Sequence, residues 1–121
     1  MAIIGVGTDI VEIARFKPEQ LDRMAKRVLT EQELLQFNQH KQPQRFLAKR
    51  WAAKEAAAKA VGTGIAKGVS FQDFEISNLA SGAPVLTICG EAEKFISRPF
   101  KSHLSLSDEQ TYAVATVIIE R

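Results

Sequence analysis

The stretch RFLAKRWAAKEAAAKAVGTGI, from Arg45 to Ile65, decides the fold because it predicts one long helix. Alanine has the highest helix propensity, and Pro43, just before the stretch, is tolerated in the first turn of a helix. The glycines of the segment VGTGIAKG predict that the helix ends near Gly62. Glu55 is the only carboxylate in the stretch, so it is the residue that needs an explanation.

Helix geometry allows two interpretations of Glu55. At about 100° per residue, the side chains that share its face are Ala48, Trp51, Ala52, Ala58 and Lys59, with Arg45 near the edge. The face either packs closely on a sheet, with Glu55 paired to Lys59 one turn away, or its alanines leave room for a ligand to approach the carboxylate. Helix geometry alone leaves both interpretations open.

The rest of the chain predicts a mixed fold. Helical patterns cover residues 18–28 and the segment LTEQELLQF from Leu29, where Thr30 is the N-cap and Glu33 its capping-box partner. NQHKQPQ is a loop, and GEAEKFISR is a short helix. Strand patterns cover residues 3–11, 71–76, 84–89, 103–107 and 111–119. We therefore expect an α+β fold: a small single domain, residues 1–121, with a largely antiparallel sheet packed with one long and several short helices.

The composition sets the class of protein. A length of 121 residues, with 45% hydrophobic and 25% charged residues, fits one globular domain. The single cysteine, Cys89, has no partner for a disulfide within the chain, and no Cys/His cluster offers a zinc site. The sequence has neither a signal-peptide pattern nor an apolar run long enough to cross a membrane. We therefore expect a soluble, cytoplasmic protein that has no membrane partner.

Basic residues concentrate between Arg15 and Lys54, where ten lysines and arginines accompany four acidic residues. This asymmetry indicates either an acidic partner or only a solvated helix surface. A small RNA- or DNA-binding module would also explain it, but would leave the Glu55 face without a purpose.

Asp9 provides a second carboxylate for a site with Glu55. In a strand over residues 3–11 alternate side chains share a face, so Gly5, Gly7 and Asp9 point the same way and predict a notch beside Asp9. Mg²⁺ is usually held by one or two carboxylates together with water and phosphate oxygens, so Asp9 and Glu55 are a candidate magnesium pair. Arg45 and Lys59 are candidate partners for the phosphate charge.

Other motifs point less clearly to chemistry. His103 alternates with Ser105 and Ser107 on a polar strand face that either binds phosphate or is only surface. The segment GTGIAKG matches neither common phosphate-binding loop, and a glycine helix stop explains most of it. No serine or cysteine motif supports nucleophilic catalysis.

Four blocks of the sequence closely resemble the bacterial holo-acyl-carrier-protein synthases. These blocks are GxGTDIVEIxRF at 5–16, RFLAKRWAAKEAAAKAVGTGI at 45–65, FQDFEI at 71–76 and HLSLSDEQTYAVATVII at 103–119. The resemblance implies a phosphopantetheinyl transferase fold, and transfer of 4′-phosphopantetheine from coenzyme A to a serine of apo-acyl-carrier protein for fatty acid synthesis, with release of adenosine 3′,5′-bisphosphate. It also implies Mg²⁺ on Asp9 and Glu55, and a homotrimer with active sites between subunits.

The resemblance also suggests roles for the other candidates. Lys59 would stabilise the transition-state charge, and Glu55 is the leading candidate for the general base. Arg45 and His103 are expected to contact the nucleotide or a phosphate. An acidic helix of the carrier protein would be steered by Arg15, Arg23 and Arg27.

One position departs from the family pattern. Many members read SLSHE where this chain has Ser107-Asp108-Glu109, so no histidine role carries over to Asp108. Aspartate is common in turns, and Asp108 would then only close the connection between the last two strands.

A further alternative for the function of the whole protein is a catalytically silent subunit that binds carrier protein.

Overall fold

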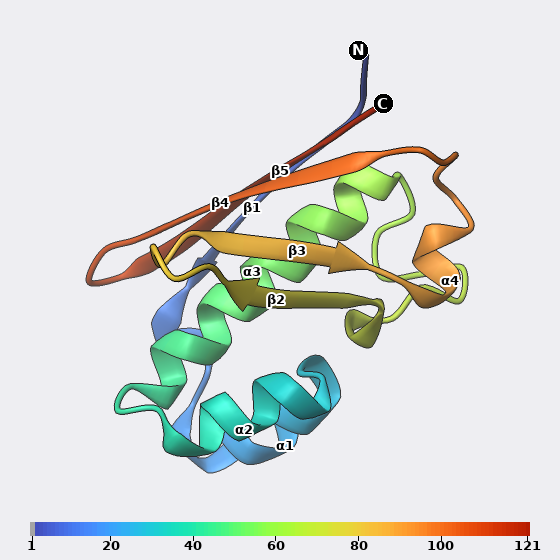
Figure 1. Ribbon diagram of the computed structural model, residues 1–121. Helices are drawn as coiled ribbons and strands as arrows, with labels where there is room; N and C mark the ends of the chain where they lie inside the picture. The colour runs from blue at the N-terminus through green and yellow to red at the C-terminus, as the bar shows by residue number, and fades with distance from the viewer. Residues whose placement is uncertain (1) are drawn as a thin grey trace.

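The computed structural model of the protein describes residues 2–121 and contains two antiparallel sheets. The first has the strand order β1 (Ile3–Glu12), β5 (Tyr112–Glu120), β4 (Lys101–Asp108). The two ends of the chain therefore lie side by side at one end of this sheet (Figure 1). The second sheet is a hairpin of β2 (Phe74–Asn78) and β3 (Pro84–Ile88). The expected antiparallel pairing is confirmed, but the strands divide into two sheets.

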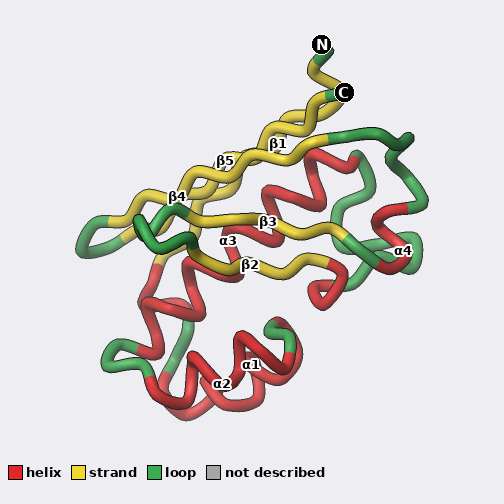
Figure 2. Tube along the Cα trace, in the orientation of Figure 1, coloured by secondary structure: helices red, strands yellow, loops and turns green. Residues whose placement is uncertain are grey.

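The long predicted helix is α3 (Pro43–Val61), and the other elements are arranged around it. It runs along one face of the three-stranded sheet, and the β2–β3 hairpin also packs against it, with β3 beside β4 (Figure 2). Near its N-terminal half lie α1 (Leu21–Val28) and α2 (Glu31–Gln39), whereas α4 (Gly90–Glu93) follows β3. The α+β class is confirmed. Within residues 2–121, no helix has the length and apolar character needed to cross a bilayer.

Helix ends agree with the sequence signals where capping chemistry defines them. The Glu33 amide donates to Thr30 Oγ1 at 3.3 Å and the Thr30 amide donates to Glu33 Oε1 at 2.9 Å, which confirms the predicted capping box. Gly62 ends α3 with a left-handed φ of 98°, as predicted.

Three predicted elements are shorter in the structure than in the sequence pattern. The predicted helix over 18–28 and the predicted strand over 71–76 each begin with a single 3-10 turn, at Pro18–Gln20 and Phe71–Asp73. The second turn is closed by the Asp73 carboxylate, which accepts from the Ser70 amide at 3.2 Å. The predicted helix over 90–98 is helical only in α4.

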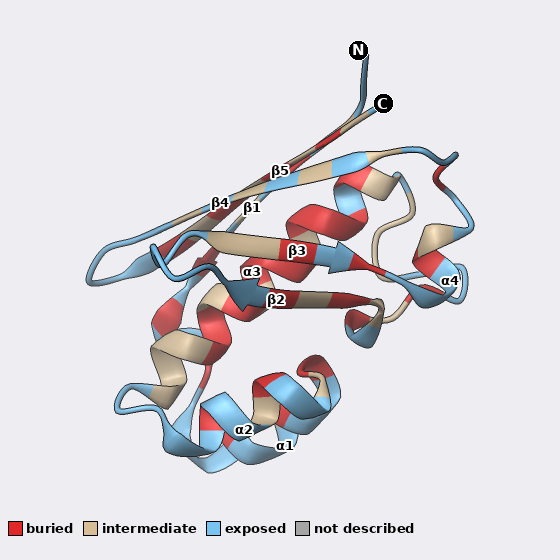
Figure 3. Ribbon diagram, in the orientation of Figure 1, coloured by how far each residue is buried: buried red, intermediate tan, exposed pale blue. Residues whose placement is uncertain are grey.

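The two glycines of β1 allow α3 to lie directly on the strand. A Cβ atom built on Gly7 would lie 1.9 Å from the Ala56 carbonyl oxygen, and one on Gly5 would lie 2.0 Å from that of Ala60. Figure 3 shows in red that buried residues occur along most of α3. The predicted notch beside Asp9 is therefore not open, because the backbone of α3 fills the space that the glycines leave.

The alanines on the Glu55 face serve the same close packing. Ala48, Ala52 and Ala58 are fully buried in the core. These alanines therefore pack against the protein itself, and the approach of a ligand to Glu55, which is only partly buried, stays a prediction. Small side chains let the surrounding elements approach the helix on several sides.

A buried ion pair holds α3 against α2 and the end of α1. Lys54 Nζ lies 2.6 Å from Glu33 Oε1 and donates to the Val28 carbonyl at 2.7 Å. Glu33 Oε2 accepts from the Ile76 amide at 2.9 Å. Burial lowers the pKa of Lys54, and the charge of Glu33 opposes this shift. Because both side chains are buried, losing either one would leave an uncompensated charge, which typically costs about 3–5 kcal/mol.

Gly7→Ala should destabilise the protein. The new methyl group would overlap a backbone carbonyl rather than a flexible side chain, so β1 and α3 would have to separate. We expect a loss of about 1–3 kcal/mol in the free energy of unfolding, the usual cost of overpacking a core. Urea unfolding at a fixed protein concentration measures it. Thr87→Ala on the exposed face of β3 is the control and should change stability little; equal stability of both variants would contradict the close contact.

Candidate active site

β1 and α3 bring Asp9 and Lys59 together. Asp9 lies two residues beyond Gly7, on the face of β1 that meets α3. Lys59 Nζ lies 3.2 Å from Asp9 Oδ1 and donates to the Thr8 carbonyl at 3.0 Å. Residues 2–121 contain no ion pair between Lys59 and Glu55, so the pairing expected from helix spacing is wrong. The lysine instead joins the helix to the strand.

Glu55 is partly buried beside this pair. Burial raises the pKa of the Glu55 carboxyl above its ordinary value, and the negative charge of Asp9 raises it further. The positive charges of Lys59, Arg15 and Arg27 oppose the shift. The two carboxylates therefore lie close enough to repel each other when both are ionised.

The residues at this position fit a magnesium ion. A divalent cation would relieve the repulsion between Asp9 and Glu55, and carboxylate oxygens are the hard donors that Mg²⁺ prefers. No group of three or more His, Cys, Asp or Glu side chains that could hold a metal occurs in residues 2–121. A magnesium ion on these two carboxylates would therefore take its other ligands from water and phosphate, as magnesium sites in proteins commonly do.

Two arginines and two aromatic rings form a row beside Glu55. The Arg15 guanidinium carbon lies 5.6 Å from the centre of the Trp51 ring, and that of Arg27 lies 5.9 Å from the Phe71 ring. The two rings are themselves 4.9 Å apart. Cation–π contacts of this kind hold arginines in place without consuming their hydrogen-bond donors. Two of the three arginines predicted to meet a carrier protein thus border the candidate site.

Arg45 lies away from these carboxylates within one chain. It lies in the first turn of α3 and is separated from Glu55 by roughly 15 Å of helix, at the standard rise per residue. Its Nη1 donates to Asp108 Oδ2 at 2.7 Å and to the Glu109 carbonyl at 2.6 Å. The structure therefore ties Arg45 to the β4–β5 turn and does not bring it to Asp9.

His103 and Arg23 also lie apart from the carboxylate pair. His103 is exposed on β4, on the face opposite α3, where its Nε2 lies 2.5 Å from Glu120 Oε2. The predicted alternation is confirmed, because Leu104 and Leu106 are partly buried whereas His103, Ser105 and Ser107 are exposed. Arg23 is exposed on α1.

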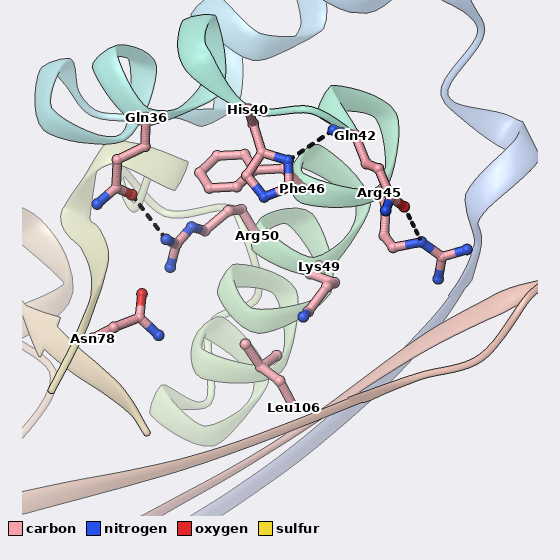
Figure 4. A pocket seen from close by; sticks show the side chains of 9 residues that line it. All are labelled: Gln36, His40, Gln42, Arg45, Phe46, Lys49, Arg50, Asn78 and Leu106. Atoms are coloured by element: carbon pink, nitrogen blue, oxygen red, sulfur yellow. Dashed lines mark hydrogen bonds between the residues drawn. The ribbon is translucent and has the colours of Figure 1, made fainter. Parts of the chain in front are cut away.

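Apart from these carboxylates, the structure has a basic pocket of about 410 Å³ near the N-terminal half of α3 (Figure 4). It lies between α2, α3, Asn78 of β2 and Leu106 of β4. Its basic lining residues are Arg45, Lys49 and Arg50. This combination of cations in one concave site suits an anionic group such as phosphate.

Sequence reasoning did not identify Arg50 as a candidate. Its side chain is buried, its guanidinium carbon lies 4.7 Å from the Phe46 ring, and its Nη2 donates to Gln36 Oε1 at 3.0 Å. Burial lowers the pKa of Arg50, whereas Glu33 and Glu75 oppose that shift. No carboxylate in residues 2–121 forms an ion pair with it. An available signal was that Arg50 lies one turn before Lys54, on a helix face that is otherwise buried.

Comparisons with known proteins define the class. A family model described as the 4′-phosphopantetheinyl transferase superfamily matches residues 5–117, so the chain belongs to that superfamily. It is 55% identical to the holo-[acyl-carrier-protein] synthase of Shewanella frigidimarina, over 99% of each chain. Within the superfamily, the chain is a member of the holo-[acyl-carrier-protein] synthase family.

Solved structures agree with this assignment. The holo-[acyl-carrier-protein] synthase of Neisseria meningitidis matches with a TM-score of 0.84 and 43% identity, covering 98% of this chain and 99% of that one. The enzyme from Bacillus anthracis, solved in complex with CoA (3′,5′-ADP), matches with a TM-score of 0.84 and 40% identity, covering 99% and 98%. The resemblance seen in the sequence is confirmed.

Removing the charge of Asp9 should lower the pKa of Glu55. In the metal-free protein, Asp9→Asn abolishes the like charge that makes ionisation of Glu55 costly, so the pKa should move toward its ordinary value. Carboxyl NMR shifts of Glu55 during a pH titration measure this. Asp22→Asn, on exposed α1, is the control and should leave the titration unchanged. An identical Glu55 titration in Asp9→Asn and the unmodified protein would show that the carboxylates are not neighbours.

Proposed function

We propose that this chain transfers 4′-phosphopantetheine from coenzyme A to a serine of apo-acyl-carrier protein, with Asp9, Glu55 and Lys59 at the reacting site. The observation that carries the proposal is that these side chains converge from β1 and α3 beside a row of arginines. Two acids and a lysine can together hold a metal, accept a proton and contact phosphate. The bound CoA (3′,5′-ADP) of the Bacillus anthracis enzyme supports coenzyme A as the donor.

The transfer makes one phosphorus–oxygen bond and breaks another. The serine oxygen attacks the phosphorus that carries the pantetheine arm, the bond to adenosine 3′,5′-bisphosphate breaks, and that product leaves with the bonding pair. Glu55 accepts the serine proton, directly or through a water molecule. Lys59 is exposed enough to turn its ammonium group toward the phosphate oxygens. When bound to Asp9 and Glu55, Mg²⁺ would neutralise pyrophosphate charge.

The basic pocket is the proposed site for a nucleotide phosphate. Arg45 was expected to contact the nucleotide, and its neighbours Lys49 and Arg50 add two cations to the same pocket. Because roughly 15 Å of helix separates Arg45 from Glu55, the pocket of a neighbouring subunit would complete the site. His103, on the outer face of β4, would then also meet a neighbour.

The transfer assay tests the function directly. Incubation of the protein with apo-acyl-carrier protein, coenzyme A and Mg²⁺ should add the phosphopantetheine mass to the carrier serine. Asp9→Asn and Glu55→Gln should fold yet lose about 10²–10³-fold in turnover, as when other groups that stabilise developing charge are removed. Glu91→Gln, an exposed carboxylate on α4, is the matched control and should stay active. Salt-dependent nucleic-acid binding with no mass gain would favour a nucleic-acid module instead.

The arginines near the N-terminus are the proposed docking region for the carrier protein. Arg15 and Arg27 border Glu55, so changing either would also disturb the reacting site. Arg23 is exposed on α1, so a substitution there tests the steering of the carrier protein separately from the reacting site. Arg23→Glu should raise KM for the carrier protein and weaken its salt dependence, with kcat nearly unchanged. An unchanged KM and salt dependence would contradict docking at this position, and Lys94→Glu next to α4 is the control for charge reversal.

The outer face of the three-stranded sheet is the proposed contact between subunits of a homotrimer. Val6 and Ile10 of β1 are 61% and 63% exposed there, although large apolar side chains at the surface of a sheet are usually covered. Sedimentation should give a trimer, and Ile10→Asp should dissociate it. Leu79→Asp, an equally exposed leucine after β2, should leave the trimer intact. A monomer at micromolar concentration would contradict the shared site.

The reaction is proposed to occur in the cytoplasm, where the exposed thiol of Cys89 would stay reduced.

A further inference from the structure

The basic side chains of the pocket differ in how they are paired. Asp108 Oδ2 lies 2.7 Å from Arg45 Nη1, and its Oδ1 lies 3.4 Å from Lys49 Nζ. Arg45 and Lys49 are one helical turn apart on α3, so a single carboxylate can span them. Arg50, by contrast, has no carboxylate in residues 2–121 as an ion-pair partner. Two of the three cations are thus already engaged by the chain itself.

Asp108 is charged at neutral pH and partly shielded from water. Partial burial opposes its ionisation, but hydrogen bonds from Arg45 and Lys49 outweigh that effect and hold the pKa of Asp108 below its ordinary value. Its side chain is only 25% exposed. Water therefore screens the cluster less than it screens a fully exposed pair.

The Asp108 carboxylate does not close the β4–β5 turn. The Glu109 amide donates to the Tyr112 carbonyl at 3.0 Å, and the Glu109 carboxylate accepts from the amides of Thr111 and Tyr112 at 2.7 and 2.8 Å. The expectation that Asp108 only shapes this turn therefore does not account for its side chain. The Asp108 carboxylate is directed to the pocket cations instead.

We propose that Asp108 is a specificity-determining residue, whose carboxylate competes with a ligand phosphate for Arg45 and Lys49. This inference rests on the proposed function, because it takes the pocket as the site for a phosphate of coenzyme A. A phosphate that enters must displace the carboxylate or share the two cations with it. Arg50 is then the cation of the pocket that a ligand would not share with Asp108, and Asp108 limits how strongly the pocket favours highly charged ligands.

Asp108→Asn tests the competition because the amide keeps the size of the side chain and removes its charge. Calorimetry with coenzyme A at low salt should show a Kd lowered by roughly two- to fivefold, the range expected from partly exposed ion pairs. The salt dependence of binding should become steeper, because a ligand phosphate gains the freed cations. Glu91→Gln removes the same charge far from the pocket and should leave the Kd unchanged.

Two further arms locate the effect. In an Arg45→Gln background the gain from Asp108→Asn should shrink, since one of the released cations is absent. The same comparison is then made with 3′-dephospho-coenzyme A. If Asp108→Asn no longer lowers the Kd, the ribose phosphate is the group that competes with Asp108, and if it still lowers the Kd, the pyrophosphate is that group. Both outcomes support the proposal. An unchanged or raised Kd for coenzyme A in Asp108→Asn would overturn it. Failure of the unmodified protein to bind or transfer coenzyme A would instead refute the proposed function.

Discussion

The contact between the glycines of β1 and the carbonyls of α3 is the constraint on which the site depends. Gly7 lies against Ala56 and Gly5 against Ala60, where even a methyl group would collide with backbone oxygen. With the helix this close to the strand, residues next to the contact on each element become neighbours. Asp9 follows Gly7 by two residues, and Glu55 precedes Ala56 by one. The small residues therefore act on the site indirectly: they set the distance between two backbones, and the carboxylates follow.

Distance alone would leave the helix free to rotate, and the buried ion pair removes that freedom. Lys54 and Glu55 are adjacent, so their side chains point about 100° apart around α3. Lys54 is held in the core by Glu33 and by the Val28 carbonyl. Fixing Lys54 toward α1 and α2 turns Glu55 toward β1 and the arginine row. The ion pair thus orients the helix on the sheet, although a buried charge pair contributes little net stability by itself.

The sequence was sufficient for features set by local chemistry. The Thr30 cap, the Gly62 stop and the strand alternation around His103 depend on neighbouring residues and were predicted correctly. The pairing of Asp9 with Glu55 as magnesium ligands came from ligand chemistry and from the resemblance to a known family, and it stays a prediction. Contacts between distant segments were not predictable in this way. Lys59 bonds Asp9 rather than Glu55, and Arg45 bonds Asp108, because tertiary packing decides which of several available carboxylates a flexible cation reaches.

The basic pocket also depends on the helix cap of α2. Arg50 and Lys54 lie one turn apart on α3, and their like charges oppose each other in a desolvated environment. Glu33 favours the charged form of both, and Glu75, bonded to Thr30 Oγ1 at 2.6 Å, adds to the compensation. Glu33 therefore caps α2, pairs with Lys54, accepts from the Ile76 amide of β2 and offsets part of the cost of burying the Arg50 charge. A substitution of Glu33 would affect all four at once, so the pocket cannot be tuned independently of the core beneath it.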